Sequence, residues 1–330
     1  MIKIAVTGGS GFIGSHLVDE LIKQNYEVLV IDNLVNGRTE NNEEVAQNPN
    51  FKFYDADILD FAKMREILKD VDIVYHLACL GVRHSIHSPF ENHRVNAEGS
   101  LNVLEAARIN KVKKFFYIST SEIYGDIKLF PIDETGVPLP KTVYGSSKLA
   151  GEHYAYSYYK CYDLDVTITR IFNNYGPRAH YEGDAGEIIP RSVVNILYEK
   201  RPVVFGDGSV TRDFFYVKDT AKALVKLIST PNLSGEIFNI GTGVEITMTD
   251  LQNTLLDLMS KRKELPIEYL GDRPADVPRL WVDAKKFNST TGFKAEYSFE
   301  EGLLETIKYY RQLFETTNML EKIKLINWEK

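Results

Sequence analysis

The stretch "TGGSGFIGSH", residues Thr7–His16, carries Gly8, Gly11 and Gly14 at even spacing. It follows the apolar run "IKIAV" and precedes apolar residues at helical spacing, which predicts a tight turn between a buried strand and a helix. Glycine lets the backbone approach a pyrophosphate, and a helix N-terminus offers free N–H groups to the anion. The spacing differs from the usual G-x-G-x-x-G. Its place between a strand and a helix still predicts a dinucleotide-binding loop.

Strand-like and helix-like segments alternate through the first half of the chain. This alternation predicts right-handed βαβ units and a parallel sheet covered on both faces. We therefore expect an α/β fold, a Rossmann-type doubly wound parallel sheet with a smaller C-terminal α/β substrate-binding domain. The expected strands are residues 2–8, 26–32, 51–58, 71–78, 113–120 and 165–176, and the expected helices are 9–25, 61–70, 96–111 and 144–160.

The regular alternation fades after Gly176, where loops rich in glycine, proline and charge begin. We expect residues 1–172 to form the dinucleotide-binding domain and residues 173–330 to form mainly the substrate-binding domain. The segments "DFFYV" and "EIFNIGTG", near residues 214–241, are apolar enough to return to the main sheet.

Composition narrows the functional classes. The 330 residues carry a net charge of −7, which argues against nucleic acid or an anionic membrane as a general partner. The chain has only two cysteines, Cys79 and Cys161, and no apolar segment of membrane-spanning length. We expect a cytoplasmic protein. The histidines at 76, 84, 87 and 93 lack convergent ligand spacing, so no metal site is expected.

Acidic residues follow two of the expected strands. Asp32 ends the second strand, close to the offset at which a carboxylate accepts hydrogen bonds from the adenosine ribose. Such a carboxylate would repel a 2′-phosphate, which favours NAD over NADP. Asp57 and Ile58 end the third strand and are expected to lie against the adenine.

A tyrosine and a lysine share one face of a later helix. Tyr144 and Lys148, in "YGSSK", lie at i and i+4. A free tyrosine has a pKa of about 10, and an ammonium about 4 Å away in a partly buried site would lower it by roughly three units. The pattern therefore predicts a tyrosine poised as a general base.

Together these motifs resemble the extended short-chain dehydrogenase/reductases, in the NAD-dependent nucleotide-sugar epimerase/dehydratase group. The resemblance covers nearly the whole chain. It rests on the glycine loop and on "HLAC", "STSEIYG", "YGSSK", "RIFNNYGPR", "FGDGSVTRDFFYVKD", "NIGTG" and "GDRPADVPR". It implies a nucleotide-diphosphate sugar as substrate and a homodimer built on paired helices near residues 93–108 and 144–160.

The resemblance also implies the roles of individual residues. Thr120 would bind the sugar's 4-hydroxyl, Tyr144 would remove its proton, and Lys148 would lower the tyrosine's pKa and bind the nicotinamide ribose. The further implied cofactor contacts are Phe12, Ile13, Asn33, Leu77 and Ala78. The implied substrate contacts are Ser121, Asn173, Phe205, Arg212 and Arg273, where the arginines would clamp the pyrophosphate.

Glu122 separates the reactions that this group performs. All members form a 4-keto intermediate, but only a 4,6-dehydratase must also take the 5-proton and expel the 6-hydroxyl. Many epimerases of the group carry a small neutral residue here, and the dTDP-glucose dehydratases carry Thr-Asp-Glu. This chain has Thr120-Ser121-Glu122, as do GDP-mannose 4,6-dehydratases and UDP-glucuronate decarboxylases.

We therefore expect an NDP-hexose 4,6-dehydratase in which Glu122 serves first as base and then as acid. The first alternative is a 4-epimerase like UDP-glucose 4-epimerase. The second is a UDP-glucuronate decarboxylase, although the longer decarboxylase pattern around the tyrosine is not reproduced in "KTVYGSSK". A non-catalytic NAD-sensing regulator is disfavoured because both Tyr144 and Lys148 are present.

Overall fold

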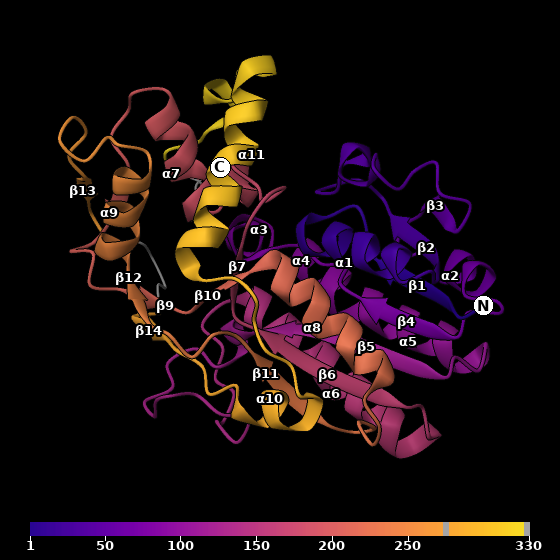
Figure 1. Ribbon diagram of the computed structural model, residues 1–330. Coiled ribbons are helices and arrows are strands. Elements are labelled where there is room, and N and C mark those ends of the chain that lie inside the picture. The colour runs from indigo at the N-terminus through magenta and orange to yellow at the C-terminus, as the bar shows by residue number, and fades with distance from the viewer. Residues whose placement is uncertain (273–276, 327–330) are drawn as a thin grey trace.

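Seven parallel strands form the central sheet of the computed structural model, which describes residues 1–272 and 277–326 (Figure 1). The chain order reverses between β1 and β4, and the carboxyl ends of the strands at such a switch point form the usual ligand crevice. In spatial order the strands are β11 (Ile237–Ile240), β6 (Val166–Ile171), β5 (Lys114–Thr120), β4 (Ile73–His76), β1 (Lys3–Thr7), β2 (Glu27–Asp32) and β3 (Phe51–Asp55).

Side chains of β1 alternate between the two faces of the sheet, as the two-residue period of a strand requires. Ile4 and Val6 join the core beneath α1 and α8, whereas Ala5 joins the core beneath α2, α5 and α6. Because helices cover both faces of the sheet, residues 4–6 of β1 are all apolar. The covering helices are α1 (Phe12–Lys23) and α8 (Val217–Ser229) on one face, and α2 (Phe61–Ile67), α5 (Gly99–Ile109) and α6 (Val143–Tyr162) on the other.

A separate apolar core holds the C-terminal part together. Val193, Leu255 and Ile307 are buried in it, and they come from three helices of this part. These helices are α7 (Ile188–Leu197), α9 (Met248–Leu258) and α11 (Phe299–Thr316). Short sheets flank them: β7 (Asn173–Tyr175) with β10 (Phe214–Tyr216); β12 (Ile246–Thr247) with β9 (Thr211–Arg212) and β14 (Arg279–Leu280); and β13 (Glu268–Leu270) with β8 (Val203–Phe205).

The structure differs from the expected elements at the junction of the two parts. The expected strand 165–176 is broken at Phe172, which is buried in a fourth apolar cluster, and β7 then leaves the main sheet. Of the two segments expected to return to that sheet, "EIFNIGTG" supplies β11, but "DFFYV" forms β10 and pairs with β7. Both segments are apolar because both are buried, so periodicity could not separate them.

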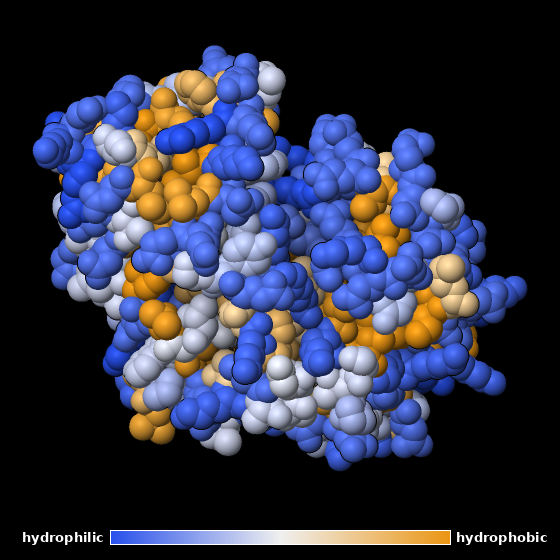
Figure 2. All heavy atoms as spheres, viewed as in Figure 1, coloured by the Kyte–Doolittle hydropathy of each residue, from blue (hydrophilic) through white to orange (hydrophobic). Residues whose placement is uncertain are grey.

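The surface of the molecule in the view of Figure 2 is largely hydrophilic. Figure 2 also shows a notch between the part that carries α11 and the part that carries β3. Within residues 1–272 and 277–326, no helix has the length and apolar character needed to cross a membrane. The short helices are α3 (Val82–His87), α4 (Pro89–His93) and α10 (Lys285–Thr291).

Candidate active site

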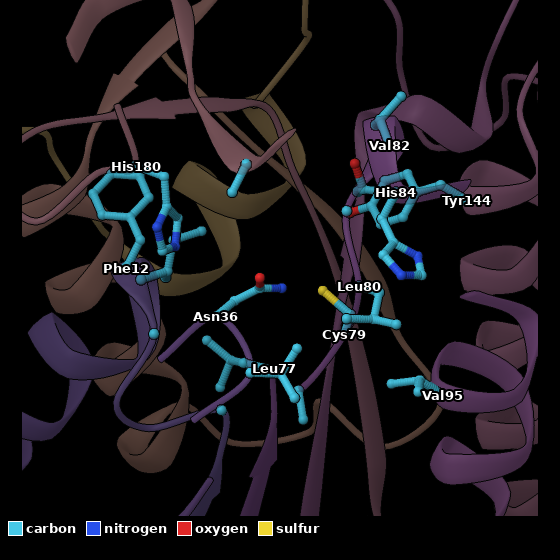
Figure 3. A pocket seen from close by; sticks show the side chains of 18 of the residues that line it. Phe12, Asn36, Leu77, Cys79, Leu80, Val82, His84, Val95, Tyr144 and His180 are labelled. Atoms are coloured by element: carbon cyan, nitrogen blue, oxygen red, sulfur yellow. The ribbon is translucent and has the colours of Figure 1, made fainter. Parts of the chain in front are cut away.

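One cleft of about 1170 Å³ runs along the carboxyl ends of the strands. That volume exceeds the usual range for a single small-ligand pocket, about 300–1000 Å³, so the cleft has room for a dinucleotide and a second ligand. Figure 3 shows Phe12 and His180 on one wall and Val82, His84 and Tyr144 on the opposite wall. Leu77 and Cys79 lie between these walls.

The glycine loop forms a cradle at one end of the cleft. Gly8 has a φ of +72° and donates its N–H to the Ile31 carbonyl at 2.8 Å. A Cβ on Gly8 would lie 2.8 Å from the Ala78 nitrogen, and one on Gly14 would lie 2.1 Å from the Gly8 oxygen. No side chain therefore fits at these two positions. The first turn of α1 lines the cleft with its unpaired N–H groups, which suits a diphosphate.

Asp32 ties the end of β2 to this loop. Its carboxylate accepts hydrogen bonds from the backbone N–H groups of Ser10, at 3.0 Å, and Leu34, at 2.9 Å. Burial raises the pKa of Asp32, and these two hydrogen bonds only partly oppose the shift. Asp32 therefore holds the backbone of the glycine loop in place, besides its expected role of binding the adenosine ribose. Asn33 and Asp57 line the same end of the cleft and are joined by a hydrogen bond of 3.2 Å.

Thr120 and Tyr144 meet at the centre of the cleft. Thr120 ends β5, and Tyr144 lies in the first turn of α6, which Thr142 caps by accepting the Gly145 N–H at 3.1 Å. The Thr120 side chain is hydrogen-bonded to Tyr144. Two hydroxyls from different elements are thus held together where one sugar hydroxyl could contact both.

Burial, more than any charge, sets the pKa of Tyr144. It holds this pKa well above 10; the neighbouring Cys79 adds to the shift, the Thr120 hydrogen bond opposes it, and Glu122 raises the pKa further. The expectation that Lys148 lowers this pKa stays a prediction. The Lys148 ammonium donates to the Ile118 carbonyl at 2.7 Å.

Glu122 lies in the turn that follows β5. Its backbone N–H donates to the Thr120 hydroxyl at 3.2 Å, and its half-buried side chain lines the cleft. Because its charge raises the pKa of Tyr144, the carboxylate lies within electrostatic reach of that hydroxyl. Ser121, beside it, is buried and lines the same wall.

Asn173 and Arg212 mark the neck between the cleft and a smaller side pocket, and they line both. The Asn173 side-chain oxygen is buried without a hydrogen-bond partner among the described residues. Arg212 donates to the carbonyls of Thr211 and Val277, each at 2.7 Å. Phe205 lines the side pocket rather than the cleft, and Arg273 lies outside the described residues.

The remaining residues with an expected cofactor role also line the cleft. They are Gly11, Phe12, Ile13, Ile58, Leu77 and Ala78. Histidines and acids within residues 1–272 and 277–326 form no group of three or more that could hold a metal ion.

Several residues of the cleft wall escaped the sequence analysis. Arg38 and Glu182 form an ion pair that spans the cleft, and His180 is bonded to the same carboxylate at 3.2 Å. Arg83 and His84 come from α3, directly after β4. None of the five belongs to a motif with a recognisable spacing. Only the position of "GVRHSIH", directly after an expected strand end, could have drawn attention to Arg83.

Comparison with known proteins confirms the resemblance. The family described as "GDP-mannose 4,6 dehydratase" matches residues 5–306. The chain belongs to this family. A curated relative, a putative UDP-glucose 4-epimerase of Methanocaldococcus jannaschii, is 37% identical over 93% of this chain and 98% of its own length.

Two solved structures share the fold and both parts of the molecule. A UDP-glucose 4-epimerase of Thermotoga maritima is 34% identical, with a TM-score of 0.89 over 95% of this chain and 100% of that one. A dTDP-glucose 4,6-dehydratase of Streptomyces venezuelae, solved with NAD, is 31% identical, with a TM-score of 0.91 over 97% of this chain and 100% of that one. The expected Rossmann-type α/β fold and the expectation of an enzyme are thereby confirmed. Because family members at similar identity perform different reactions, the family alone does not select one.

Proposed function

We propose that this protein is an NAD-dependent 4,6-dehydratase of a nucleotide-diphosphate sugar. The observation that carries the proposal is Glu122, which lines the cleft within electrostatic reach of the Thr120–Tyr144 pair. That pair suits oxidation at carbon 4, and the extra acid suits the elimination that distinguishes a dehydratase from an epimerase.

The residues present fit the cofactor. The cradle of Gly8, Gly11 and Gly14 leaves space for a pyrophosphate, and Asp32 lies where a ribose hydroxyl could donate to it. NAD supplies the hydride acceptor for carbon 4. Lys148 already holds its ammonium at the floor of the cleft, bonded to the Ile118 carbonyl, where it can bind a ribose.

The proton transfers are assigned to three side chains. Tyr144 would remove the proton of the 4-hydroxyl while Thr120 holds the same oxygen, and with loss of the 4-hydrogen as hydride to NAD this would give the 4-keto sugar. The ketone acidifies the neighbouring 5-hydrogen, and the Glu122 carboxylate removes it as a proton. The same carboxyl then protonates the departing 6-hydroxyl, so that water leaves. The bound cofactor would supply the hydride for carbon 6, and a solvent proton at carbon 5 would complete the 4-keto-6-deoxy product.

A 4-epimerase is the second candidate, and one observation favours it. Ser121 is buried where the dTDP-glucose dehydratases carry an aspartate, so the site has one acid fewer than theirs. The relatives from M. jannaschii and T. maritima bear epimerase names. An epimerase would return the hydride to the opposite face of carbon 4 and would leave the 5-hydrogen in place.

Turnover in heavy water tests the choice. We would offer GDP-mannose, UDP-glucose, dTDP-glucose and UDP-N-acetylglucosamine in parallel and analyse the products by mass spectrometry. A dehydratase gives a product lighter by one water with deuterium at carbon 5. A product of unchanged sugar mass without deuterium at carbon 5 would replace the dehydratase with the epimerase.

A variant of the acid gives an independent readout. Glu122→Gln should oxidise carbon 4 but stall before elimination, so reduced cofactor absorbing near 340 nm would accumulate. The matched control is Glu91→Gln, which removes an acid of the cleft wall that pairs with His84 instead. Full dehydration by Glu122→Gln would remove the base role assigned to this residue.

The cofactor is tested separately. The wild type should bind NAD much more tightly than NADP in calorimetric titrations, because Asp32 repels a 2′-phosphate. Asp32→Ala combined with Asn33→Arg should reverse the preference. Tighter binding of NADP by the wild type would refute the role given to Asp32.

A further inference from the structure

Arg83 occupies the neck between the cleft and the side pocket. It lines both cavities, as Asn173 and Arg212 do. Arg83 is carried by α3, at the end of the main sheet, whereas Asn173 and Arg212 come from β7 and β9 in the C-terminal part. Basic and amide groups from the two parts thus face one passage, together with the carboxylate of Glu187.

The guanidinium of Arg83 is poorly paired for its burial. Its side chain is only 14% exposed, and its single ion pair within the described residues joins Nη1 to Glu187 Oε1 at 3.6 Å, beyond hydrogen-bond distance. Glu187 is itself 45% exposed, so water weakens that attraction. The Nε of Arg83 is buried and has no hydrogen-bond partner among the described residues. A buried donor without an acceptor destabilises a fold unless a ligand supplies the missing hydrogen bond.

The two buried atoms without a hydrogen-bond partner among the described residues, Arg83 Nε and Asn173 Oδ1, indicate the chemistry of a ligand that would bind them. The Nε–H of arginine belongs to the edge that binds two oxygens of a carboxylate or phosphate side by side. The buried Asn173 oxygen, an acceptor without a partner in the described residues, calls for a hydroxyl. A ligand that brings both an oxyanion and hydroxyl groups to the neck would satisfy both atoms, and a nucleotide sugar has both.

We propose that Arg83 binds an oxyanion of the substrate and thereby contributes to substrate affinity. The inference rests on the proposed function for the orientation of the substrate, with the sugar at Thr120 and the nucleotide towards the side pocket. The oxyanion is either an oxygen of the diphosphate or a carboxylate on the sugar. A planar carboxylate and a tetrahedral phosphate each offer two oxygens that the guanidinium can bind.

Binding measurements on the cofactor-loaded protein test the proposal without requiring turnover. The probes are UDP, GDP, dTDP and CDP, followed by UDP-glucose and UDP-glucuronate. The variants are Arg83→Gln, which removes the charge, and Arg83→Lys, which keeps the charge but loses the fork. Arg94→Gln is the matched control, because Arg94 also lines the cleft but is 62% exposed and faces Glu98 at 4.0 Å.

We expect Arg83→Gln to weaken binding of the responsive probes by about 10- to 100-fold, as the loss of charged hydrogen bonds does, and Arg94→Gln to leave it unchanged. Arg83→Lys should fall between them. If the diphosphate is the partner, UDP and both sugar nucleotides weaken alike. If a sugar carboxylate is the partner, only UDP-glucuronate weakens, and the dehydratase assignment falls because a uronate has no 6-hydroxyl to lose.

A melting curve separates ligand binding from a structural role. Without substrate, Arg83→Gln should melt at the wild-type temperature or above it, because it removes a poorly paired buried charge. Unchanged affinity for every probe, or a lower melting temperature with unchanged affinity, would overturn the inference while leaving the proposed function intact. Failure of the wild type to bind any of the six probes would instead refute the nucleotide-sugar function.

Discussion

At the scale of the residue, the burial of Tyr144 opposes the role of general base that we propose for it. Burial raises its pKa well above 10, so the hydroxyl is protonated near neutral pH. A base that starts protonated gains reactive fraction as the pH rises, so the reaction should be faster in alkali.

Replacing Tyr144 with phenylalanine should lower kcat by about 100- to 10,000-fold, the usual range for a lost general base, while the cofactor stays bound. In the wild type, kcat/KM should rise between pH 6 and pH 8, because the deprotonated fraction grows as the pH approaches a raised pKa. Steady-state rates and cofactor absorbance measure both effects. Tyr158→Phe is the control, since that hydroxyl donates to Glu105 at 2.9 Å and lies outside the cleft lining. A Tyr144→Phe enzyme of near-normal rate would exclude the proton transfer assigned to this residue.

The site residues that could be predicted from the sequence belong to short motifs. Thr120 ends an expected strand, and Tyr144 and Lys148 share one face of an expected helix. The structure brings all three together in one cleft. Arg38 and Arg83 enter the same cleft through long-range folding. Nothing local distinguishes Arg38 from a solvated surface charge, and only its place shortly after an expected strand end marks Arg83. Their position depends on which loops the topology places over the sheet edge, and a single sequence does not specify that placement.

At the scale of the element, the turn before α1 depends on close backbone contact. Gly14→Ala should abolish cofactor binding and destabilise the fold by several kcal/mol, because its Cβ would lie 2.1 Å from the Gly8 oxygen. Gly11→Ala is the matched comparison. Its Cβ would lie 3.2 Å from the same atom, so a small shift could relieve the contact, and the loss of stability should be about 1 kcal/mol. Denaturant unfolding of both variants gives the comparison, and equal stability losses would contradict it.

The segment 177–187 contains only one short 3₁₀ helix, Gly183–Ala185, and side chains hold it across the cleft. Burial alone would raise the pKa of Glu182, but hydrogen bonding to His180 and the charge of Arg38 outweigh burial and bring the pKa to about 2. Arg178 of the same segment is paired with Asp19 of α1 at 2.6 Å. The segment is therefore held by its charges as well as by Tyr181, which is buried in the C-terminal core.

Glu182→Gln should lower the free energy of unfolding at pH 7 by about 2 kcal/mol. A carboxyl with a depressed pKa stabilises the fold above its unfolded pKa, about 4.5, and this contribution is lost as the pH falls towards 2. The difference from the wild type should therefore shrink in melts at pH 4 and pH 3. Glu66→Gln, which breaks an exposed pair with Lys63, should change stability by less than about 0.5 kcal/mol at any pH. A Glu182→Gln deficit that stays constant down to pH 3 would rule out this ion pair as its source.

The fold was more predictable in its first half than in its second. Alternating strands and helices specify a parallel sheet, and the handedness of βαβ units leaves few topologies. In the second half, Phe172 breaks an apolar run that periodicity treats as continuous, and the short strands β8, β9 and β12 are too brief to leave a pattern. Such strands are stabilised by distant partners rather than by their own sequence. The division into domains at residue 172 stays a prediction.

At the scale of the whole molecule, helices α5 and α6 pack together on one face of the sheet and carry apolar side chains outward. Leu101 and Tyr156 are 38% and 44% exposed, and Ile109 and Tyr162 are similarly accessible. Exposed apolar groups gathered on neighbouring helices favour burial against a second copy.

We predict a homodimer through this face of α5 and α6, with a dimer mass in light scattering at micromolar concentration. Leu101→Glu with Tyr156→Glu should give monomers, because each would place a charge in the apolar contact. Val137→Glu, at a side chain 77% exposed on another segment, should remain dimeric. A monomer mass for the wild type would refute the assembly, and a dimer that survives the double substitution would place the contact elsewhere.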